Sequence, residues 1–326
     1  MKINWIRLKR AVRSNRHTRK MADFIYVVFT GQYIEKKHII SKNGETCYII
    51  RPPYSPNGLG GLYLYVLGHI QYARSKGYIP AVDFEHYKTV YSGEAVSGNR
   101  NIWEWYFKQP GGIPLKKALA GNYILARTAP RSRESVMVEF AKGNTDLLKQ
   151  YCEVGGGICL NENMNCYIRQ AEENLKLKKE KALGVFCRGS DYVQLKPCGH
   201  PVQPELNDLM DQAEECLTKW NCEKIFLLTE EKEALQRFNR RFPGKVISSH
   251  QNLVDNYTVD SGLLIEDFKT KQFGSRYISG MEYLAGIVLL ASCDSFLGAM
   301  AGGSAAALVW NGGKYTHCKI INLGVY

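Results

Sequence analysis

The sequence lacks several features that define common classes of protein. The clearest apolar run outside the expected core segments, residues 24–30, is far shorter than the roughly 20 apolar residues that a membrane-spanning helix needs. There is no internal repeat and no low-complexity tract, and we expect no signal peptide. These absences argue against an integral membrane protein, and they make the cytoplasm the expected location.

A disulfide framework is also missing, although the chain has ten cysteines. Such frameworks belong to short secreted chains, and this chain has 326 residues. Cys187, Cys293 and Cys318 fall in apolar segments, which predicts reduced thiols in a cytosolic protein. A second, evenly spaced series matches no metal-ligand pattern, so no metal site is expected. It consists of Cys152, Cys159 and Cys166.

Acidic residues are absent from the first 20 positions, which carry eight lysines and arginines. The net charge of the whole chain is +12, so most of the excess is concentrated there. Ile3, Trp5 and Leu8 are interleaved with these cations, a pattern typical of a short basic amphipathic helix on an anionic membrane surface. A solvated basic tail is the alternative. Nucleic-acid binding is not expected, because no aromatic-basic motif follows.

What the chain does contain fits a globular protein, with 45% hydrophobic and 23% charged residues. A chain of this length is expected to form more than one domain. We predict a basic segment over residues 1–20, a first α/β domain over 21–175 and a second over 176–326.

The first domain opens with a βαβ pattern. Residues 46–51 predict a strand, 62–76 an apolar helix and 79–84 the next strand. Glycines in the loop between them would let the backbone approach a ligand, and the following helix N-terminus favours an anion. The spacing matches neither a Walker nor a dinucleotide motif, so alone this signal is weak. Further along, the aromatic cluster at 99–115 is interpreted as a local core, or as the lining of an acceptor cleft.

The second domain alternates strands and helices in a doubly wound pattern. The expected strands are 182–187, 224–229, 245–248, 295–297 and 319–323. The expected helices are 204–220, 231–242, 280–292 and 305–310.

Polar residues follow the first of these strands. Arg188 ends the apolar run, and Asp191 comes three residues later. In open α/β sheets, ligands bind beyond the carboxyl ends of the strands. The arginine would offer a planar fork of donors to a phosphate, and the aspartate would hold that fork. An Arg–Asp pair that only tethers a loop is the alternative.

Two further expected strand ends are polar. Thr229 is a candidate for binding a ribose or base, with helix capping as the alternative. At the third, a loop of small residues meets a helix start, where backbone N–H groups would hold a diphosphate. Together these ends predict a nucleotide site. Its expected contacts are Arg188, Thr229, Glu230, Asp294, Ser295, Gly303 and Ser304.

These motifs resemble those of the fucosyltransferase-like glycosyltransferases, inverting enzymes that use GDP-fucose. Asn57-Gly58-Leu59-Gly60 is similar to the glycine loop of their α-1,2 branch. The resemblance covers residues 46–323 as scattered short motifs. It implies a GT-B fold, in which two Rossmann-like α/β domains face a central cleft. The family's first motif usually reads His-x-Arg-x-x-Asp, and here Phe186 stands at the histidine position.

The resemblance implies transfer of a sugar, with GDP-fucose as the expected donor, to a glycan or lipid-linked oligosaccharide in surface polysaccharide synthesis. The enzyme would work at the inner face of the membrane, without a metal or other cofactor. Arg188 would neutralise the leaving diphosphate. The candidate bases are Asp191, His200, Glu282, Glu104 and His69, each with a structural hydrogen bond as the alternative. The expected acceptor or cleft residues are Asn57, Gly58, Gly60, His69 and Glu104.

Two other functions fit the same pattern. One is a glycosyltransferase of this fold that uses another nucleotide sugar, and the other is a non-catalytic nucleotide- or carbohydrate-binding protein. A donor screen separates the first from GDP-fucose transfer, and release of a nucleoside diphosphate separates the second.

Overall fold

The structure, a computed structural model, describes most of the chain after residue 35. The described residues are 36–41, 44–51, 58–86, 89, 91–93, 95–126, 133–175, 181–196, 198, 200–249, 252–255, 257 and 265–326. The expected basic helix at 1–20 and Asn57 lie outside these ranges.

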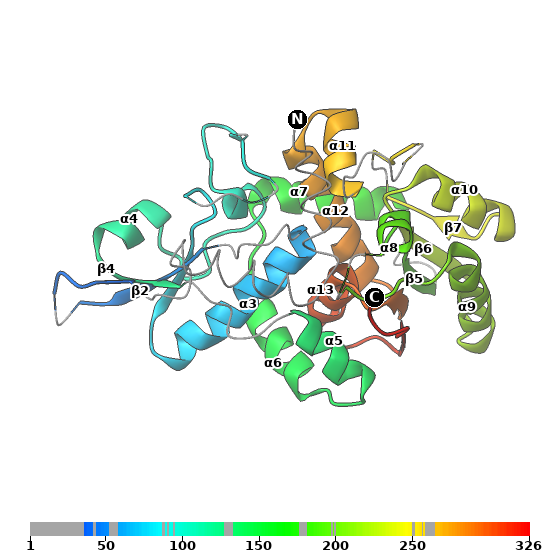
Figure 1. The fold of residues 1–326 in the computed structure, drawn as a ribbon, viewed down its shortest axis with the longest axis horizontal. Coiled ribbons are helices and arrows are strands. Elements are labelled where there is room, and N and C mark those ends of the chain that lie inside the picture. The colour runs from blue at the N-terminus through cyan, green and yellow to red at the C-terminus, as the bar shows by residue number, and fades with distance from the viewer. Residues whose placement is uncertain are drawn as a thin grey trace, which may run out of the picture.

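Two β-sheets lie toward opposite ends of the long axis of the molecule, with helices between them (Figure 1). The first sheet has the order β1-β4-β2-β3. Its strands are β1 (Lys36–His38), β2 (Thr46–Ile50), β3 (Ile79–Val82) and β4 (Asn122–Ala126). β2 runs parallel to β3 and β4, so the carboxyl ends of these three strands lie at one edge.

The second sheet is wholly parallel, with the order β7-β6-β5-β8-β9. Its strands are β5 (Ala182–Phe186), β6 (Lys224–Leu228), β7 (Val246–Ile247), β8 (Ser295–Ala299) and β9 (His317–Ile321). Every residue of β5 and β8 is buried, as the continuous apolar runs of central parallel strands predict.

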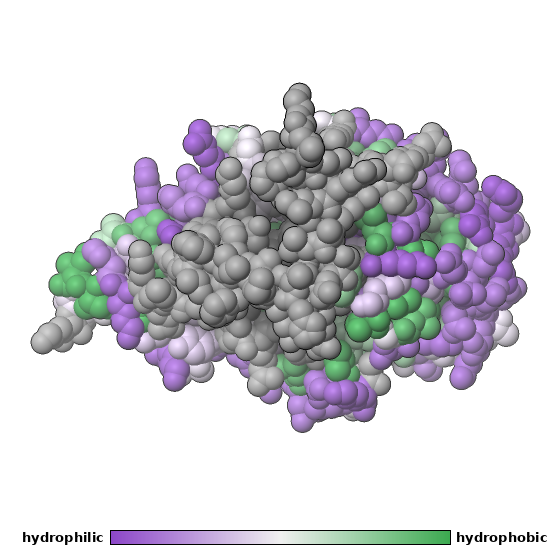
Figure 2. Space-filling model, viewed as in Figure 1, coloured by the Kyte–Doolittle hydropathy of each residue, from purple (hydrophilic) through white to green (hydrophobic). Residues whose placement is uncertain are grey.

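Helices cover both faces of the second sheet. α9 (Leu206–Lys219) and α10 (Lys232–Arg241) pack on the face that carries Leu183 and Val185. Their outer surface is largely hydrophilic in the view of Figure 2, as amphipathic surface helices require. α12 (Arg276–Ala291) and α13 (Gly302–Asn311) lie on the opposite face.

α12, α13 and α3 (Leu59–Ser75) form the middle of the molecule. α12 is apolar around most of its circumference, because it packs on the second sheet and on helices of the first half. A single hydrophobic cluster therefore includes Tyr48 and Ile50 of the first sheet and Phe226 and Phe296 of the second. The other described helices are η1 (Ile102–Trp105), α4 (Leu115–Ala120), α5 (Arg133–Ala141), α6 (Asp146–Gly155), α7 (Glu162–Leu175), α8 (Ser190–Leu195) and α11 (Ile265–Phe273).

Three helices begin earlier than the sequence pattern predicts. α3 starts at Leu59 rather than at residue 62, α12 at Arg276 rather than 280, and α13 at Gly302 rather than 305. Two of these first turns contain glycines, which have poor intrinsic helix propensity but permit close packing. Tertiary contacts therefore decide where these helices begin.

The aromatic cluster at residues 99–115 belongs to the hydrophobic core and does not line an open cleft. Trp103, Trp105, Tyr106 and Phe107 are each at most 3% exposed.

All ten cysteines lie in the described part of the chain, and all are free thiols. Of the three that we expected in the core, Cys293 is buried, whereas Cys187 and Cys318 are partly exposed. None of the helices in the described part is long and apolar enough to cross a membrane.

Candidate functional site

Arg188 lies two residues beyond the carboxyl end of β5, with its guanidinium between two carboxylates. Its Nη2 donates a hydrogen bond of 3.1 Å to Asp191 Oδ2, and its Nη1 lies 3.8 Å from Glu230 Oε2. The guanidinium carbon lies 4.6 Å from the centre of the Tyr192 ring. The Arg188 side chain is 12% exposed, so it is held in one orientation while part of it remains open to solvent.

Asp191 is fully buried and holds the arginine in place. Besides Arg188, its oxygens accept hydrogen bonds from the backbone N–H groups of Tyr192, at 2.9 Å, and Ile265, at 3.4 Å. Gly189, with φ of +65°, makes the turn that brings Asp191 back to the strand end. This arrangement suits orientation of a guanidinium better than proton transfer from a substrate.

The charged cluster that begins at Arg188 extends through Glu230 to Lys269 and Glu282. The fully buried Lys269 amine lies 3.1 Å from Glu282 Oε2 and 3.9 Å from Glu230 Oε1. Glu282 also accepts hydrogen bonds from the backbone N–H and side-chain amide of Asn252, at 3.1 and 2.8 Å. Glu282 is 6% exposed and committed to these partners, which argues against the catalytic role expected from the sequence.

Two more predicted residues lie at this edge. His200 Nδ1 and the Tyr192 hydroxyl lie 3.1 Å apart, so His200 buttresses the ring that stacks on Arg188. Thr229 Oγ1 accepts a 3.3 Å hydrogen bond from the N–H of Glu231, which closes a local turn. The N-cap of α10 is Glu231, so Thr229 is not the helix cap that we gave as its alternative.

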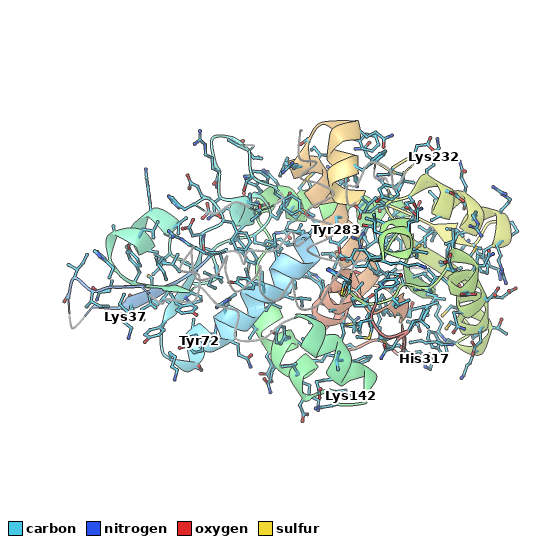
Figure 3. All side chains as sticks on the ribbon, viewed as in Figure 1. Lys37, Tyr72, Lys142, Lys232, Tyr283 and His317 are labelled. Atoms are coloured by element: carbon cyan, nitrogen blue, oxygen red, sulfur yellow. The ribbon has the colours of Figure 1, made fainter. Side chains whose placement is uncertain are left out.

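The N-termini of α13 and α3 meet beside this edge. A Cβ added to Gly60 would lie 3.2 Å from the Gly302 carbonyl oxygen and 3.0 Å from the Tyr283 hydroxyl. Tyr283 is near the middle of the molecule in Figure 3, where the two halves adjoin. The N-cap residues of the two helices are Gly58 and Ala301, and neither makes a side-chain capping bond. Helix N-termini of this kind favour an anion.

Phe186 explains why α13 begins with glycine. A Cβ on Gly303 would lie within 2.4 Å of the Phe186 ring, so only glycine fits against it. The side chain at the family's histidine position therefore packs against the first turn of α13. Ser304 is fully buried, and its hydroxyl donates a 2.7 Å hydrogen bond to the Ala299 carbonyl, which joins β8 to α13.

The predicted position of Asp294 and Ser295 is wrong. β8 begins at Ser295, so both residues lie at the amino edge of the sheet, opposite Arg188. Asp294 Oδ2 accepts a 2.9 Å hydrogen bond from the N–H of Ala182, at the start of β5. The pattern Cys-Asp-Ser marks the start of the strand and not its end.

His69 and Glu104, which we expected in the cleft, are both engaged in contacts within the first half of the molecule. His69 is fully buried in α3, its Nδ1 lies 3.2 Å from the Tyr48 hydroxyl, and burial lowers its pKa to about 3. The two Glu104 carboxylate oxygens accept hydrogen bonds from the side-chain amides of Asn99, at 2.8 Å, and Gln109, at 2.6 Å. The interpretation of His69 as a cleft residue is therefore wrong, and Glu104 acts as a local hydrogen-bond acceptor.

Sequence reasoning missed two groups of charged residues. Lys269 had no recognisable signal, because α11 reaches Glu282 only in the folded chain. The second group follows the carboxyl ends of β2 and β3 and consists of Arg51, Asp83 and His86. The strand-edge rule, by which ligands bind beyond the carboxyl ends of parallel strands, would have found these residues if it had been extended from the second sheet to the first. Among the described residues, no group of three or more His, Cys, Asp or Glu side chains is arranged to hold a metal ion.

Comparison with solved structures identifies the fold. A mutant of the FUT1 protein of Arabidopsis thaliana, in complex with GDP, superposes with a TM-score of 0.50 at 11% identity, over 93% of this chain and 75% of that chain. The fucosyltransferase NodZ from Bradyrhizobium gives 0.47 at 14% identity, over 82% and 93%. The apo form of POFUT1 gives 0.49 at 9% identity, over 86% and 99%.

No family model matches the sequence, and no curated protein matches it. The structural similarity to fucosyltransferases nevertheless extends across most of the chain, and the predicted GT-B fold of two α/β units is confirmed.

Proposed function

We propose that the protein is a glycosyltransferase that moves a sugar, fucose from GDP-fucose in the favoured case, to a glycan or lipid-linked oligosaccharide. The observation that carries the proposal is Arg188, a partly exposed guanidinium held by Asp191 and Glu230 at the carboxyl edge of a parallel sheet. This edge is where α/β proteins of this architecture bind nucleotides.

The leaving group of such a reaction is a nucleoside diphosphate, whose negative charge grows as the bond to the sugar breaks. Arg188 would bind its phosphate oxygens, and backbone N–H groups in the first turns of α13 and α3 would add to the site, although that of Leu59 is already bonded to the Tyr91 hydroxyl. GDP is the first nucleotide to test, because the similar FUT1 structure was solved in complex with it.

The acceptor and location extend the same proposal. The eight cations of residues 1–20 would hold the enzyme on the inner, anionic face of a membrane, where lipid-linked acceptors for surface polysaccharides are assembled. This part rests on the sequence alone, because the segment lies outside the described residues.

Replacement of Arg188 tests the diphosphate site. GDP at about 100 times its dissociation constant should stabilise the wild-type protein by about 2.7 kcal/mol, seen as a rise in Tm. In Arg188→Ala, the GDP-induced rise in Tm and the release of GDP from GDP-fucose with acceptor should both be lost. Arg188→Lys should recover only part of the binding, because an ammonium cannot form a bidentate contact.

Arg241→Ala is the matched control, because Arg241 lies on the exposed side of α10 and pairs with Asp211 and Glu214. It should keep the full response to GDP. Normal GDP binding and turnover in Arg188→Ala would overturn the assignment. A wild-type response to UDP-sugars alone would replace the donor and keep the reaction class.

A further inference from the structure

A second charged cluster lies at the carboxyl edge of the first sheet and has no part in the proposed diphosphate site. Arg51 follows β2 and Asp83 follows β3, and their side chains pair through Arg51 Nε and Asp83 Oδ2 at 2.8 Å. His86 joins them from the loop after β3, with its Nδ1 2.8 Å from Asp83 Oδ1.

Asp83 is built to orient the His86 ring. It is fully buried, and its Oδ1 also accepts the backbone N–H groups of Glu85, at 3.3 Å, and His86, at 3.2 Å. Because the carboxylate is an acceptor, it selects the tautomer in which Nδ1 carries the proton. The lone pair is then on Nε2, and the His86 side chain is 50% exposed.

Tyr91 and Ser92, a few residues after His86, make contacts where the two halves adjoin. The Tyr91 hydroxyl accepts a 3.0 Å hydrogen bond from the N–H of Leu59, the first residue of α3. The Ser92 carbonyl accepts one of 3.4 Å from Arg276, the first residue of α12. The same first turn of α3 contacts the start of α13 through Gly60 and Gly302.

We propose that His86 is the catalytic base of the transfer and that Asp83 is its positioning residue, an inference that rests on the proposed glycosyltransferase function. The acceptor hydroxyl oxygen forms a bond to the anomeric carbon of the sugar, and the bond from that carbon to the β-phosphate oxygen breaks. The electron pair of the broken bond leaves with GDP. The hydroxyl proton passes to His86 Nε2 and then to solvent.

Three of the candidates expected from the sequence are less suited to receive a proton. His69 and Asp191 are fully buried, and Glu282 is paired with Lys269. His86 combines an orienting carboxylate with a side chain that is half exposed. Of the described charged groups, Asp83 contacts the His86 ring, Arg51 pairs with Asp83, and Glu85 is next to His86 along the chain.

Kinetics of His86→Gln test the proposal directly. A general base contributes about 10²- to 10⁴-fold, so kcat for transfer should fall by that factor while the GDP-induced rise in Tm stays at the wild-type value. The wild-type pH profile should show an acid limb, because a protonated imidazole cannot accept a proton, and this limb should disappear in the variant. His38→Gln, at an exposed histidine stacked on Tyr123, is the control and should change neither quantity.

Asp83→Asn tests the positioning role. The acid limb should shift and kcat should fall, with GDP binding retained. His86→Gln keeps the proposal falsifiable if Asp83→Asn does not fold, because the His86 side chain is half exposed. Unchanged kcat and an unchanged acid limb in His86→Gln would overturn the base assignment and leave the glycosyltransferase proposal standing. A wild-type protein that neither binds GDP nor transfers sugar would overturn both.

Discussion

At the scale of single residues, burial and partners separate side chains of the same type. His69 and His86 both bond to one neighbour through Nδ1, but His69 is fully buried and the His86 side chain is half exposed. The sequence places His69 on an apolar helix and His86 after a strand, and neither position alone reveals the exposure of the ring. The buried His69 therefore contributes to the stability of the fold, whereas the half-exposed His86 is the residue that we propose as the catalytic base.

Stability should depend on pH through His69. Its pKa in the folded protein is lowered to about 3, whereas an unfolded histidine titrates near about 6.5. Between these values only the unfolded chain binds the proton, so the free energy of unfolding falls as the pH falls, by about 2 kcal/mol between about pH 7 and pH 5. Urea unfolding of His69→Asn should show a pH dependence smaller by that amount. An exposed histidine, His317, replaced in the same way, serves as control, and equal pH dependence of His69→Asn and wild type would contradict the assignment.

At the scale of elements, the strand-edge rule predicted part of the site from sequence. The end of β5 was recognisable from an apolar run that stops at Arg188, and this places Arg188, Asp191 and Glu230 together. The rule failed at Asp294, because a short polar break looks the same before a strand as after one. It was not applied to the first sheet, where it would have found Asp83.

The helix contacts could not be predicted, because they depend on atoms from distant segments. Nothing in the sequence around Lys269 indicates that α11 would carry its amine to Glu282. The early starts of α3 and α13 are likewise set by packing between glycines and their neighbours, which local propensity does not encode.

The first turn of α13 should not tolerate a methyl group. In Gly303→Ala, the new Cβ would lie 2.4 Å from the Phe186 ring and 2.7 Å from the Tyr283 hydroxyl. Overpacking of this kind costs about 1–3 kcal/mol, which urea unfolding would measure, and displacement of the helix start should also weaken GDP binding. Gly121→Ala is the matched control: its φ is −105° and the Lys117 carbonyl, 3.9 Å away, is its nearest contact, so its stability should stay within about 0.5 kcal/mol of wild type. If the free energy of unfolding of Gly303→Ala equals that of the wild type, the prediction is wrong, because α13 must then be able to move and make room for the methyl group.

At the scale of the whole molecule, the two sheets share one core, and this has a consequence for unfolding. The cluster that joins Tyr48 and Ile50 to Phe226 and Phe296 passes through α3, α12 and α13, so neither half can lose its packing without exposing apolar surface of the other. We predict a single cooperative transition in urea. Hydrogen exchange followed by mass spectrometry should show peptides of β2 and β5 opening at the same urea concentration.

The same hydrogen-exchange experiment, repeated with GDP, tests the proposed function. Because a ligand that binds only the folded state stabilises every element that unfolds with its site, GDP should move the openings of β2 and β5 to higher urea by the same amount, although β2 belongs to the other sheet. Arg188→Ala should abolish both shifts together. Separate midpoints for β2 and β5, or a GDP shift confined to β5, would mean that the halves unfold independently and that a boundary near residues 175–176 divides the chain energetically as well as in sequence.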